Sequence, residues 1–537
     1  MQRAQNSFYY RTFVFVFLVF GDYPVFSAGS ALTWQQWEHT LTSKKTYEQP
    51  YEKVTVKVIF TGPYGESFIN YGFWDEGNIF KIRAAFPKAG GWTWQTLCSD
   101  KTNKALHNKQ GKVRVSSYQG ENSLYQKGFL KVSLDRRTLA HEDNTPFLWM
   151  GDTGWYTLRE SNLEEWRKYI DNRAAKAFTV IQVHVVSSSG TAPNDEGQMP
   201  FVNDVPNKYF WQDLETKIAY ANQKGLVVYV VGLGVSGKGG YLPAMNTKIF
   251  AQYITGRLAG SFVIFSPSMD AHYDKRNDEL GTYLKEADSR HLISQHVGTD
   301  LHAAEEFHPK EYLDFTSLQS GHHGGNIERA YKAARNWSEV LWMKKPVKPV
   351  INTEGVYDGL GNNEGLHWRE KDVRKIGWLS WLSGALGYTY GAGNNRNQIQ
   401  DSKGGVWLFN KDKTSYGYWE KALEWNSAHQ MTYMKKFFER IDWWRLQPAP
   451  ELITNQPRDS VNNMVTAKSA AGDLLVAYLP DNTEIELDME ALARGLSGKW
   501  FNPVSGDYVP INQNIKYAGS QKFTRPGEGD WVLLLNK

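Results

Sequence analysis

The chain has 537 residues, of which 41% are apolar and 22% are charged, and its formal net charge at pH 7 is +4. This composition excludes an intrinsically disordered chain, and the length predicts two to four domains. The small net charge argues against a nucleic-acid groove, although a mildly acidic polysaccharide stays open as a partner.

The N-terminal segment has the pattern of an export signal. Two arginines precede an apolar run over 12–20, and small residues follow over 27–30. The run is too short to anchor the chain in a bilayer, so we expect a signal peptide over 1–29 that is cleaved near 27–30. This predicts a secreted or periplasmic protein with no membrane contact after the signal is removed. A buried N-terminal strand is the alternative.

Residues 30–127 are predicted to form a β-sandwich. Alternating apolar runs over 54–60, 68–74 and 79–85 are separated by turns rich in Gly and Pro. Short strands at this spacing are typical of a small sandwich. Cys98 is the only cysteine, so no intrachain disulfide can stabilise it.

From 128 to 445, strand-like runs alternate with amphipathic helical stretches. Eight runs are predicted to be strands: 146–151, 179–185, 226–232, 261–265, 291–296, 313–319, 349–352 and 384–390. Eight β-then-α units predict a (β/α)8 TIM barrel. The alternative is an open doubly wound sheet, which the lack of a glycine-rich phosphate loop disfavours.

The last segment, 446–537, returns to strand-like patterns over 474–479, 499–503 and 530–535. These runs predict a second β-sandwich, so that the central barrel is flanked by a sandwich on each side. Aromatic residues make up 14% of the chain, including 21 Trp. Because Trp and Tyr pack flat against the apolar faces of sugar rings, this excess favours a carbohydrate ligand over the simpler explanation of aromatic-rich strands.

Two acidic residues at predicted strand ends are the candidate catalytic pair. Asp270 follows the fourth run and Glu354 follows the seventh, and the active site of such a barrel lies where its strands end. Glycoside hydrolysis needs one carboxyl group that donates a proton to the leaving oxygen and one ionised carboxylate at the anomeric carbon. In the alternative interpretation, Glu354 caps a helix or pairs with a cation, and Asp270 lies in a solvated loop.

Further polar and aromatic residues at the same strand ends are predicted to bind substrate. They are Asp152, Trp155, Gln182, His184, His296, Gln319, His322, Tyr357 and Trp368. Asp152 could instead support the barrel through hydrogen bonds, and each aromatic residue could be ordinary packing. The histidines lack the short spacing of metal ligands, so we expect neither a metal nor another cofactor.

Several segments resemble the apiosidase-like glycoside hydrolase family. They are Phe147–Tyr156 and Tyr169–Gln182 at the start of the barrel, and Gly384–Ala392 at its last strand. The run Ile441–Pro448 resembles the family's exit into a C-terminal domain labelled as collagen-binding. Residues 71–77 and 91–94 are similar to the immunoglobulin-like domain that often precedes this barrel.

The resemblance implies a (β/α)8 barrel that hydrolyses glycosidic bonds in a polysaccharide or oligosaccharide substrate. It implies an acid/base role for Asp270 and a nucleophile role for Glu354. Ser268 and Met269 stand where the family usually has two glycines, so the resemblance does not imply apiose as the sugar. The alternative is a barrel that binds carbohydrate or matrix without cleaving it, and the oligomeric state stays open.

Overall fold

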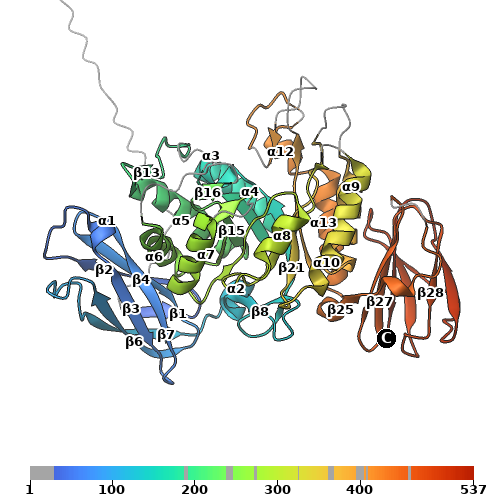
Figure 1. Cartoon of the computed structure of the whole chain (residues 1–537), viewed down its shortest axis with the longest axis horizontal. Coiled ribbons are helices and arrows are strands. Elements are labelled where there is room, and N and C mark those ends of the chain that lie inside the picture. Colours follow the sequence, from blue (N-terminus) through green and yellow to red (C-terminus); the bar gives the residue numbers. More distant parts are fainter. Residues whose placement is uncertain are drawn as a thin grey trace, which may run out of the picture.

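The computed structural model describes residues 29–186, 192–236, 246–270, 275–323, 326–360, 368–394, 404–406, 409–415, 417–457 and 461–537. All but the last residue of the predicted signal peptide lies outside these ranges. Within them, no helix has the length and apolar character needed to cross a membrane. Figure 1 shows a β-rich N-terminal region at one end, a central α/β part, and a β-rich C-terminal region at the other end.

The N-terminal strands pair in one seven-stranded sheet, in the order β1-β7-β6-β3-β4-β5-β2. The elements are β1 Ser30–Leu32, β2 Gln36–Thr42, α1 Pro50–Lys53, β3 Val56–Thr61, β4 Ser67–Glu76, β5 Ile79–Ala85, β6 Gly90–Cys98, β7 Gln110–Ser116 and α2 Ser123–Lys127. Strand β4 pairs with β3 through its first part and with β5 through its second part. The region is therefore β-rich as expected, and its arrangement as a sandwich stays a prediction.

Eight parallel strands form the central sheet, in the order β19-β17-β15-β12-β11-β22-β21-β20. They are β11 Trp149–Thr153, β12 Val180–His184, β15 Val227–Val231, β17 Val263–Phe265, β19 Leu292–Ile293, β20 Thr316–Gln319, β21 Val350–Glu354 and β22 Gly387–Tyr390. Each of the eight predicted runs overlaps one of these strands. The order is that of a TIM-like barrel whose ladder is interrupted between its fifth and sixth strands.

The edges of the central sheet, β19 and β20, are joined by irregular hydrogen bonds. The Asp314 N–H donates to the Ile293 carbonyl at 2.8 Å, and the Ser294 hydroxyl donates to the Phe315 carbonyl at 2.9 Å. The Trp149 ring lies 5.6 Å from Phe315 across the interior. Bulky side chains therefore fill the space that the curled sheet encloses, as they do in barrels of this kind.

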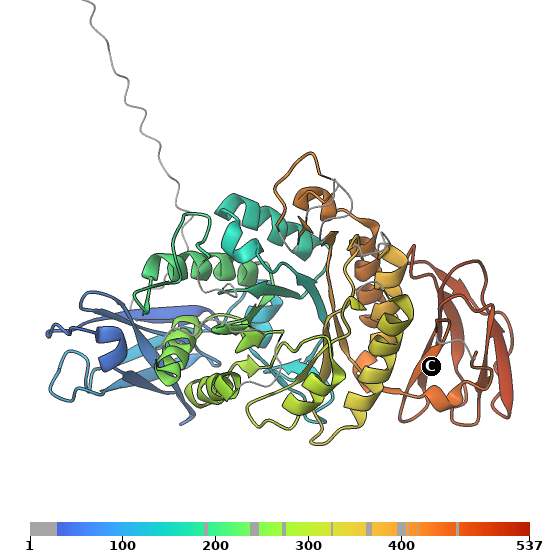
Figure 2. The same ribbon diagram turned by 45° about the horizontal axis from the view of Figure 1, so that its top comes forward.

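Helices cover the outer face of the sheet (Figure 1 and Figure 2). The helices of the central part are α3 Thr157–Glu160, α4 Leu163–Ala175, α5 Lys208–Gln223, α6 Thr247–Leu258, α7 Lys275–Ala287, α8 Leu301–Phe307, α9 Ile327–Lys332, α10 Ser338–Met343, α11 Glu370–Leu382, α12 Trp419–Ala422 and α13 Asn426–Phe438, of which α12 lies above α13 in Figure 1 and not on the sheet. Helix α4 begins at a capping box in which the Asn162 side chain accepts from the Glu165 N–H. Such local signals make the β-then-α alternation visible in the sequence.

Short strands complete the central part. They are β8 Leu130–Val132, β9 Leu139–His141, β10 Pro146–Phe147, β13 Phe201–Val202, β14 Val205–Pro206, β16 Val235–Ser236, β18 Ser268–Met269, β23 Gly393–Asn394 and β24 Gly404–Gly405. Strand β18 follows β17 and pairs in parallel with β16. This pair extends the rim of the central sheet, and the candidate acid Asp270 comes directly after it.

The C-terminal region contains a six-stranded sheet, β25-β26-β27-β32-β29-β30, and a two-stranded sheet, β28-β31. The strands are β25 Leu446–Pro448, β26 Val465–Ser469, β27 Leu474–Leu479, β28 Glu484–Asp488, β29 Ser497–Phe501, β30 Tyr508–Pro510, β31 Ser520–Thr524 and β32 Trp531–Asn536. Leu487, Phe523 and Leu533 share one apolar core. The region is β-rich as expected, and a sandwich arrangement stays a prediction here too.

Candidate active site

The two candidate catalytic carboxylates meet at the C-terminal edge of the central sheet. Glu354 is the last residue of β21, and Asp270 directly follows β18. One oxygen of each carboxylate and one ring nitrogen of His296 all lie within 4.8 Å of one another. Two residues 84 positions apart in the sequence are thus brought to the same place.

Glu354 is 4% exposed and is surrounded by hydrogen-bond donors. The Tyr357 hydroxyl donates to Oε1 at 2.6 Å, and His322 Nε2 lies 3.1 Å from the same oxygen. His296 Nε2 lies 3.2 Å from Oε2. Burial alone would raise the pKa of the Glu354 carboxyl, but the contacts with His296 and His322 outweigh it and hold that pKa well below its usual range. Glu354 is therefore ionised at neutral pH.

Asp270 has a different environment. Its side chain is 53% exposed, and its backbone has a φ of 49°, a left-handed conformation that Asp tolerates better than most residues. Partial loss of hydration, followed by the negative charge of Glu354, raises the pKa of the Asp270 carboxyl, while His296 and His322 act against the rise. The site therefore holds one carboxyl group whose pKa is lowered and one whose pKa is raised.

His296 lies between the two carboxylates and orients them. The Asp270 N–H points at His296 Nδ1 at 3.4 Å, which leaves the ring proton on Nε2, facing Glu354. The Trp155 ring packs edge-on against His296 with centroids 5.0 Å apart. Trp155 Nε1 also donates to the Tyr357 hydroxyl at 2.9 Å. These contacts fix the donors that surround Glu354.

Three more predicted residues face the same edge. Gln182 Nε2 donates to the Thr353 carbonyl at 3.0 Å, Gln319 hydrogen-bonds the Asp270 carboxylate, and His184 is buried. Burial, followed by the charges of Arg159 and His296, lowers the pKa of His184 to about 3, so its imidazole is neutral. Gln182 Oε1, His184 Nε2 and Gln319 Oε1 have no hydrogen-bond partner among the described residues. They are available to a polar ligand.

The structure does not bring Asp152 or Trp368 into this cluster. Asp152 points to the helix side of β11, where the Tyr169 hydroxyl donates to it at 2.6 Å and Arg173 Nε donates at 2.7 Å. That position fits the alternative interpretation, in which Asp152 supports the barrel through hydrogen bonds. Trp368 is buried in the apolar core that the sheet shares with its helices.

Arg159 is a buried residue near the candidate site that the sequence pattern did not reveal. It is buried at the end of α3, and its Nε and Nη1 have no partner within the described ranges. Its charge contributes to the low pKa of His184. The signal that could have found it is a cationic residue four positions after Trp155, directly behind the first strand of the barrel.

The chemistry of the three clustered groups also allows a metal ion, because Asp270, His296 and Glu354 each offer one ligand atom. However, Glu354 Oε1 already accepts from Tyr357 and faces His322. These donors compensate the charge of the carboxylate in the way that a cation would. The expectation of no metal stays a prediction, and no step proposed below depends on one.

Three family models match the chain. Residues 133–445 match "Apiosidase-like, catalytic domain", and residues 30–99 match a domain of unknown function. Residues 447–536 match "Putative collagen-binding domain of a collagenase". A search of curated proteins gave no match.

Several solved structures share the fold. A glycoside hydrolase is 23% identical with a TM-score of 0.68, over 77% of this chain and 98% of that one. A glycoside hydrolase family 5 structure from Bacteroides vulgatus is 21% identical with a TM-score of 0.67, over 78% of this chain and 96% of that one. A "putative glycoside hydrolase" from the same species is 16% identical with a TM-score of 0.68, over 95% of this chain and 99% of that one.

At these identities the solved structures show a shared fold and no more. The family is shown by the sequence model, whose match over 133–445 spans more than half of the 537 residues. The matched segment contains both clustered carboxylates, Asp270 and Glu354. The chain belongs to the apiosidase-like family.

Proposed function

We propose that the protein is a secreted glycoside hydrolase that cleaves glycosidic bonds in a complex polysaccharide and retains the configuration at the anomeric carbon. The observation that carries the proposal is the approach of the Asp270 and Glu354 carboxylate oxygens to within 4.8 Å. Retaining enzymes hold their two carboxyl groups about 5–5.5 Å apart, whereas inverting enzymes need about 6.5–9.5 Å to fit a water molecule.

In the first step, the ionised Glu354 attacks the anomeric carbon and forms a glycosyl ester. The protonated Asp270 gives its proton to the glycosidic oxygen, so that the leaving sugar departs as an alcohol. In the second step, Asp270 takes a proton from a water molecule that attacks the same carbon, and Glu354 leaves as a carboxylate. The opposite shifts of the two pKa values support this division of roles.

The substrate contacts follow from the same cluster. Gln182, His184 and Gln319 offer buried polar atoms to sugar hydroxyl groups, and none of them carries a charge that would favour an ionic ligand. We assign His296 and His322 to the positioning of Glu354, and Trp155 and Tyr357 to its hydrogen-bond network. An oligosaccharide or polysaccharide substrate fits this neutral set of groups.

The organisation proposed for the whole chain is a signal peptide over 1–29 and a closed (β/α)8 barrel over 128–445. We further propose an immunoglobulin-like sandwich over 30–127 and a second sandwich over 446–537. The two β-rich regions that flank the TIM-like sheet support this division. Export would give the enzyme access to polysaccharides outside the cell.

The experiment that tests the function compares the protein with its Glu354→Gln variant on a panel of plant and algal polysaccharides. We expect release of reducing sugar from at least one polysaccharide, and a loss of about 1,000-fold or more in the variant, because the nucleophile is removed. The control is Glu439→Gln, which changes an exposed carboxylate directly after the end of α13. Proton NMR of the first product shows which anomer forms.

Undiminished turnover in Glu354→Gln, with circular dichroism unchanged, would contradict the role given to this residue. A first product with the inverted configuration would contradict retention while leaving hydrolysis intact. Binding of a polysaccharide without any release of reducing sugar would favour the non-catalytic alternative.

A further inference from the structure

A groove of about 750 Å³ separates the N-terminal sheet from the helices α4 and α5. Strands β2 and β5 form one wall, α5 forms the other, and the segment 118–125 closes one end. Its volume lies in the range of about 300–1,000 Å³ that is typical of ligand sites.

The groove is separate from the Glu354 cluster. Helix α5 leads into β15, so the last turn of α5 lies at the edge of the sheet opposite to the C-terminal ends of the strands. Asn222 and Gln223 of that last turn line the groove. No residue of the proposed active site contributes to its lining.

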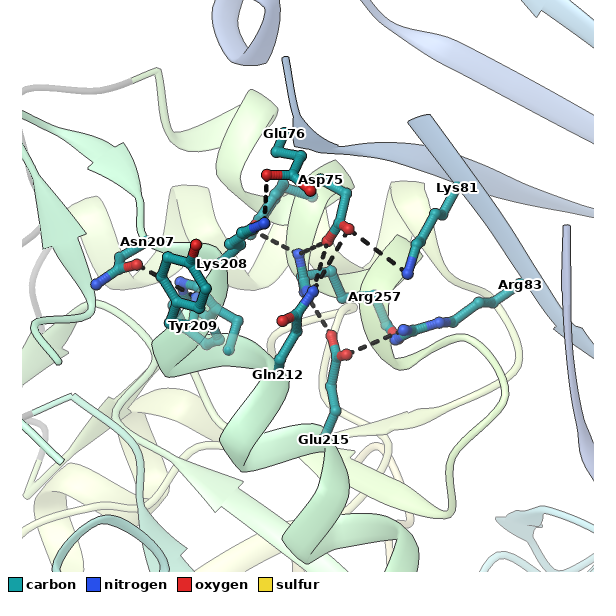
Figure 3. A network of polar contacts seen from close by, with 12 residues as sticks. Asp75, Glu76, Lys81, Arg83, Asn207, Lys208, Tyr209, Gln212, Glu215 and Arg257 are labelled. Atoms are coloured by element: carbon teal, nitrogen blue, oxygen red, sulfur yellow. Dashed lines mark hydrogen bonds and ion pairs between the residues drawn. The ribbon is translucent and has the colours of Figure 1, made fainter. Parts of the chain in front are cut away.

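The charged side chains on the floor of the groove neutralise one another. Arg83 donates from Nη2 to Glu215 at 2.9 Å and from Nε to Glu38 at 2.8 Å, and Lys81 lies 3.2 Å from Glu38. Figure 3 shows Arg83 meeting Glu215 between the N-terminal sheet and α5, and Lys81 reaching Asp75 beside them. Paired charges attract neither a strong anion nor a cation, so this floor favours a neutral ligand. Arg167, on the α4 side of the lining, is a cation outside these pairs.

Three tyrosines give the groove flat apolar faces. Tyr118 and Tyr125 pack edge to face with centroids 5.3 Å apart. Tyr220 lies on the opposite wall, where the Arg167 guanidinium is 5.4 Å and Lys224 Nζ is 5.2 Å from its ring centroid, and its hydroxyl donates to Asp171 at 2.8 Å. Within the described part of the chain, no hydrogen bond engages the Tyr125 hydroxyl. Arg167 makes no ion pair there either. Aromatic faces with a polar tip suit a ligand that is itself apolar on its faces and polar at its edges.

Amide side chains supply the hydrogen-bonding groups. The lining includes Gln35, Gln36, Gln212 and Gln223. Gln212 Nε2 already donates to Asp75, and Gln36 Oε1 accepts from Ser261. The remaining N–H donors and carbonyl acceptors of these amides suit hydroxyl groups, because a hydroxyl both donates and accepts. A sugar ring combines apolar C–H faces with a rim of hydroxyl groups, so it matches both the tyrosines and the amides.

We propose that this groove is a second, non-catalytic binding site for a neutral oligosaccharide segment. It would hold one part of a polysaccharide on the flank of the barrel. The site exists only when the N-terminal region is docked on α5, because each contributes one wall. The docked N-terminal region is thereby part of a carbohydrate-binding surface.

The test uses the full-length protein carrying Glu354→Gln, so that bound polymers stay intact. Hydrogen–deuterium exchange is followed with neutral probes: xylan, galactomannan, mixed-linkage β-glucan and arabinogalactan. We expect at least one probe to protect amides over 118–127 and 208–223. Affinity gel electrophoresis with that probe then gives the dissociation constant.

Two variants test the walls of the groove. Tyr220→Ala removes an aromatic face, and Ala219→Arg places a long side chain into the groove from a half-exposed position of α5, where Arg favours a helix. We expect each variant to weaken binding at least tenfold and to abolish the local protection. Tyr209→Ala is the matched control, since Tyr209 belongs to the same helix, is 56% exposed and lies outside the lining.

Absence of protection over 118–127 and 208–223 with all four probes would overturn the proposal. Unchanged affinity and protection in both Tyr220→Ala and Ala219→Arg would overturn it too. The outcome is independent of the proposed hydrolysis, because local protection reports the groove even if Glu354 has no catalytic role. Conversely, cleavage of a polysaccharide without any protection of the groove would support the proposed hydrolysis and contradict the second binding site.

Discussion

At the scale of single residues, the pKa values of two carboxyl groups are shifted in opposite directions. The reason is that hydrogen-bond donors surround one of them more fully than the other. Glu354 has the Tyr357 hydroxyl on one oxygen and two histidine nitrogens within 3.2 Å. Asp270 has the Gln319 amide, and its side chain is half exposed. A negative charge on one carboxylate makes a charge on the other less favourable. Glu354, which has more hydrogen-bond donors than Asp270, is therefore the one that stays ionised.

We predict that Asp270→Asn removes the fall of kcat/KM at high pH. The reaction needs Glu354 ionised, hence a pH above its lowered pKa, and Asp270 protonated, hence a pH below its raised pKa. Activity of the unmodified protein should therefore fall as the pH rises through the pKa of Asp270. In Asp270→Asn, kcat/KM should drop by about 100- to 10,000-fold and should no longer fall with rising pH.

The measurement is kcat/KM against pH on the polysaccharide found by screening, with Asp300→Asn as a control at a helix cap. Aryl glycosides with good leaving groups provide a second readout. Their first step needs little help from an acid, so Asp270→Asn should affect them less. A high-pH limb that persists unchanged in the variant would show that another group supplies the proton.

The sequence alone named two candidate catalytic residues that the fold brings together, but it did not give the direction of every side chain. Glu354 and Asp270 stand out because acidic residues end apolar runs. Asp152 also ends such a run, yet its side chain lies on the helix side with Arg173. A buried parallel strand is apolar on both faces, so its sequence alone does not show which residues face the interior.

At the scale of elements, the pair of Asp152 and Arg173 ties β11 to α4. Both side chains are fully buried, and Arg173 Nε donates to Asp152 at 2.7 Å. Tyr169 of the same helix donates to the same carboxylate oxygen. Arg173 also donates from Nη1 to the Leu423 carbonyl at 3.1 Å, which connects α4 to the segment after α12.

We predict that Arg173→Met destabilises the central part by about 3–5 kcal/mol, since it leaves a buried carboxylate without its partner. The double variant Asp152→Leu with Arg173→Met should recover part of this loss, because no charge then stays buried. The free energy of unfolding in urea is the measurement. Arg167→Met, an exposed position on the same helix, is the control.

A loss in Arg173→Met no larger than that in Arg167→Met would contradict this account. So would a double variant that is less stable than the single one. The first result would mean that neither contact of Arg173 contributes much to stability. The second would mean that the contact with Leu423, rather than charge compensation, dominates at this position.

The alternation of strands and helices could be predicted at this scale, whereas the register could not. Every predicted run overlaps a central strand because buried parallel strands are continuous apolar runs. The shift in pairing between β20 and β21 at Leu318 and Gln319 depends on long-range contacts. So does the interruption between β19 and β20. No local pattern of residues encodes either feature.

At the scale of the whole molecule, aromatic and ionic contacts dock the C-terminal region on α11. The Trp378 ring lies parallel to that of Tyr478, with centroids 5.9 Å apart and an interplanar angle of 13°. Arg374 donates to both oxygens of Asp530 at 2.8 and 2.7 Å, and the Tyr478 hydroxyl donates to Asp530 at 2.9 Å. The sequence predicted this region as a separate domain, but these pairs become visible only in the fold.

The last prediction concerns this docking. Arg374→Met should lower the free energy of unfolding by about 3–5 kcal/mol, because Asp530 would stay buried without its bidentate partner. Arg445→Met is the matched control. Arg445 also forms an ion pair, with Asp473, but that pair is partly exposed, and solvent-exposed pairs contribute little.

Urea unfolding gives the two free energies, and limited proteolysis near 446–448 reports whether the C-terminal region has loosened. We expect faster cleavage in Arg374→Met and no change in Arg445→Met. Equal stability and equal cleavage in the two variants would show that aromatic contacts, such as those of Trp378 with Tyr478 and Phe501, dock the region without the ion pair. The buried ion pair would then fix only the orientation of the region, because its Coulomb energy would merely offset the cost of removing two charges from water.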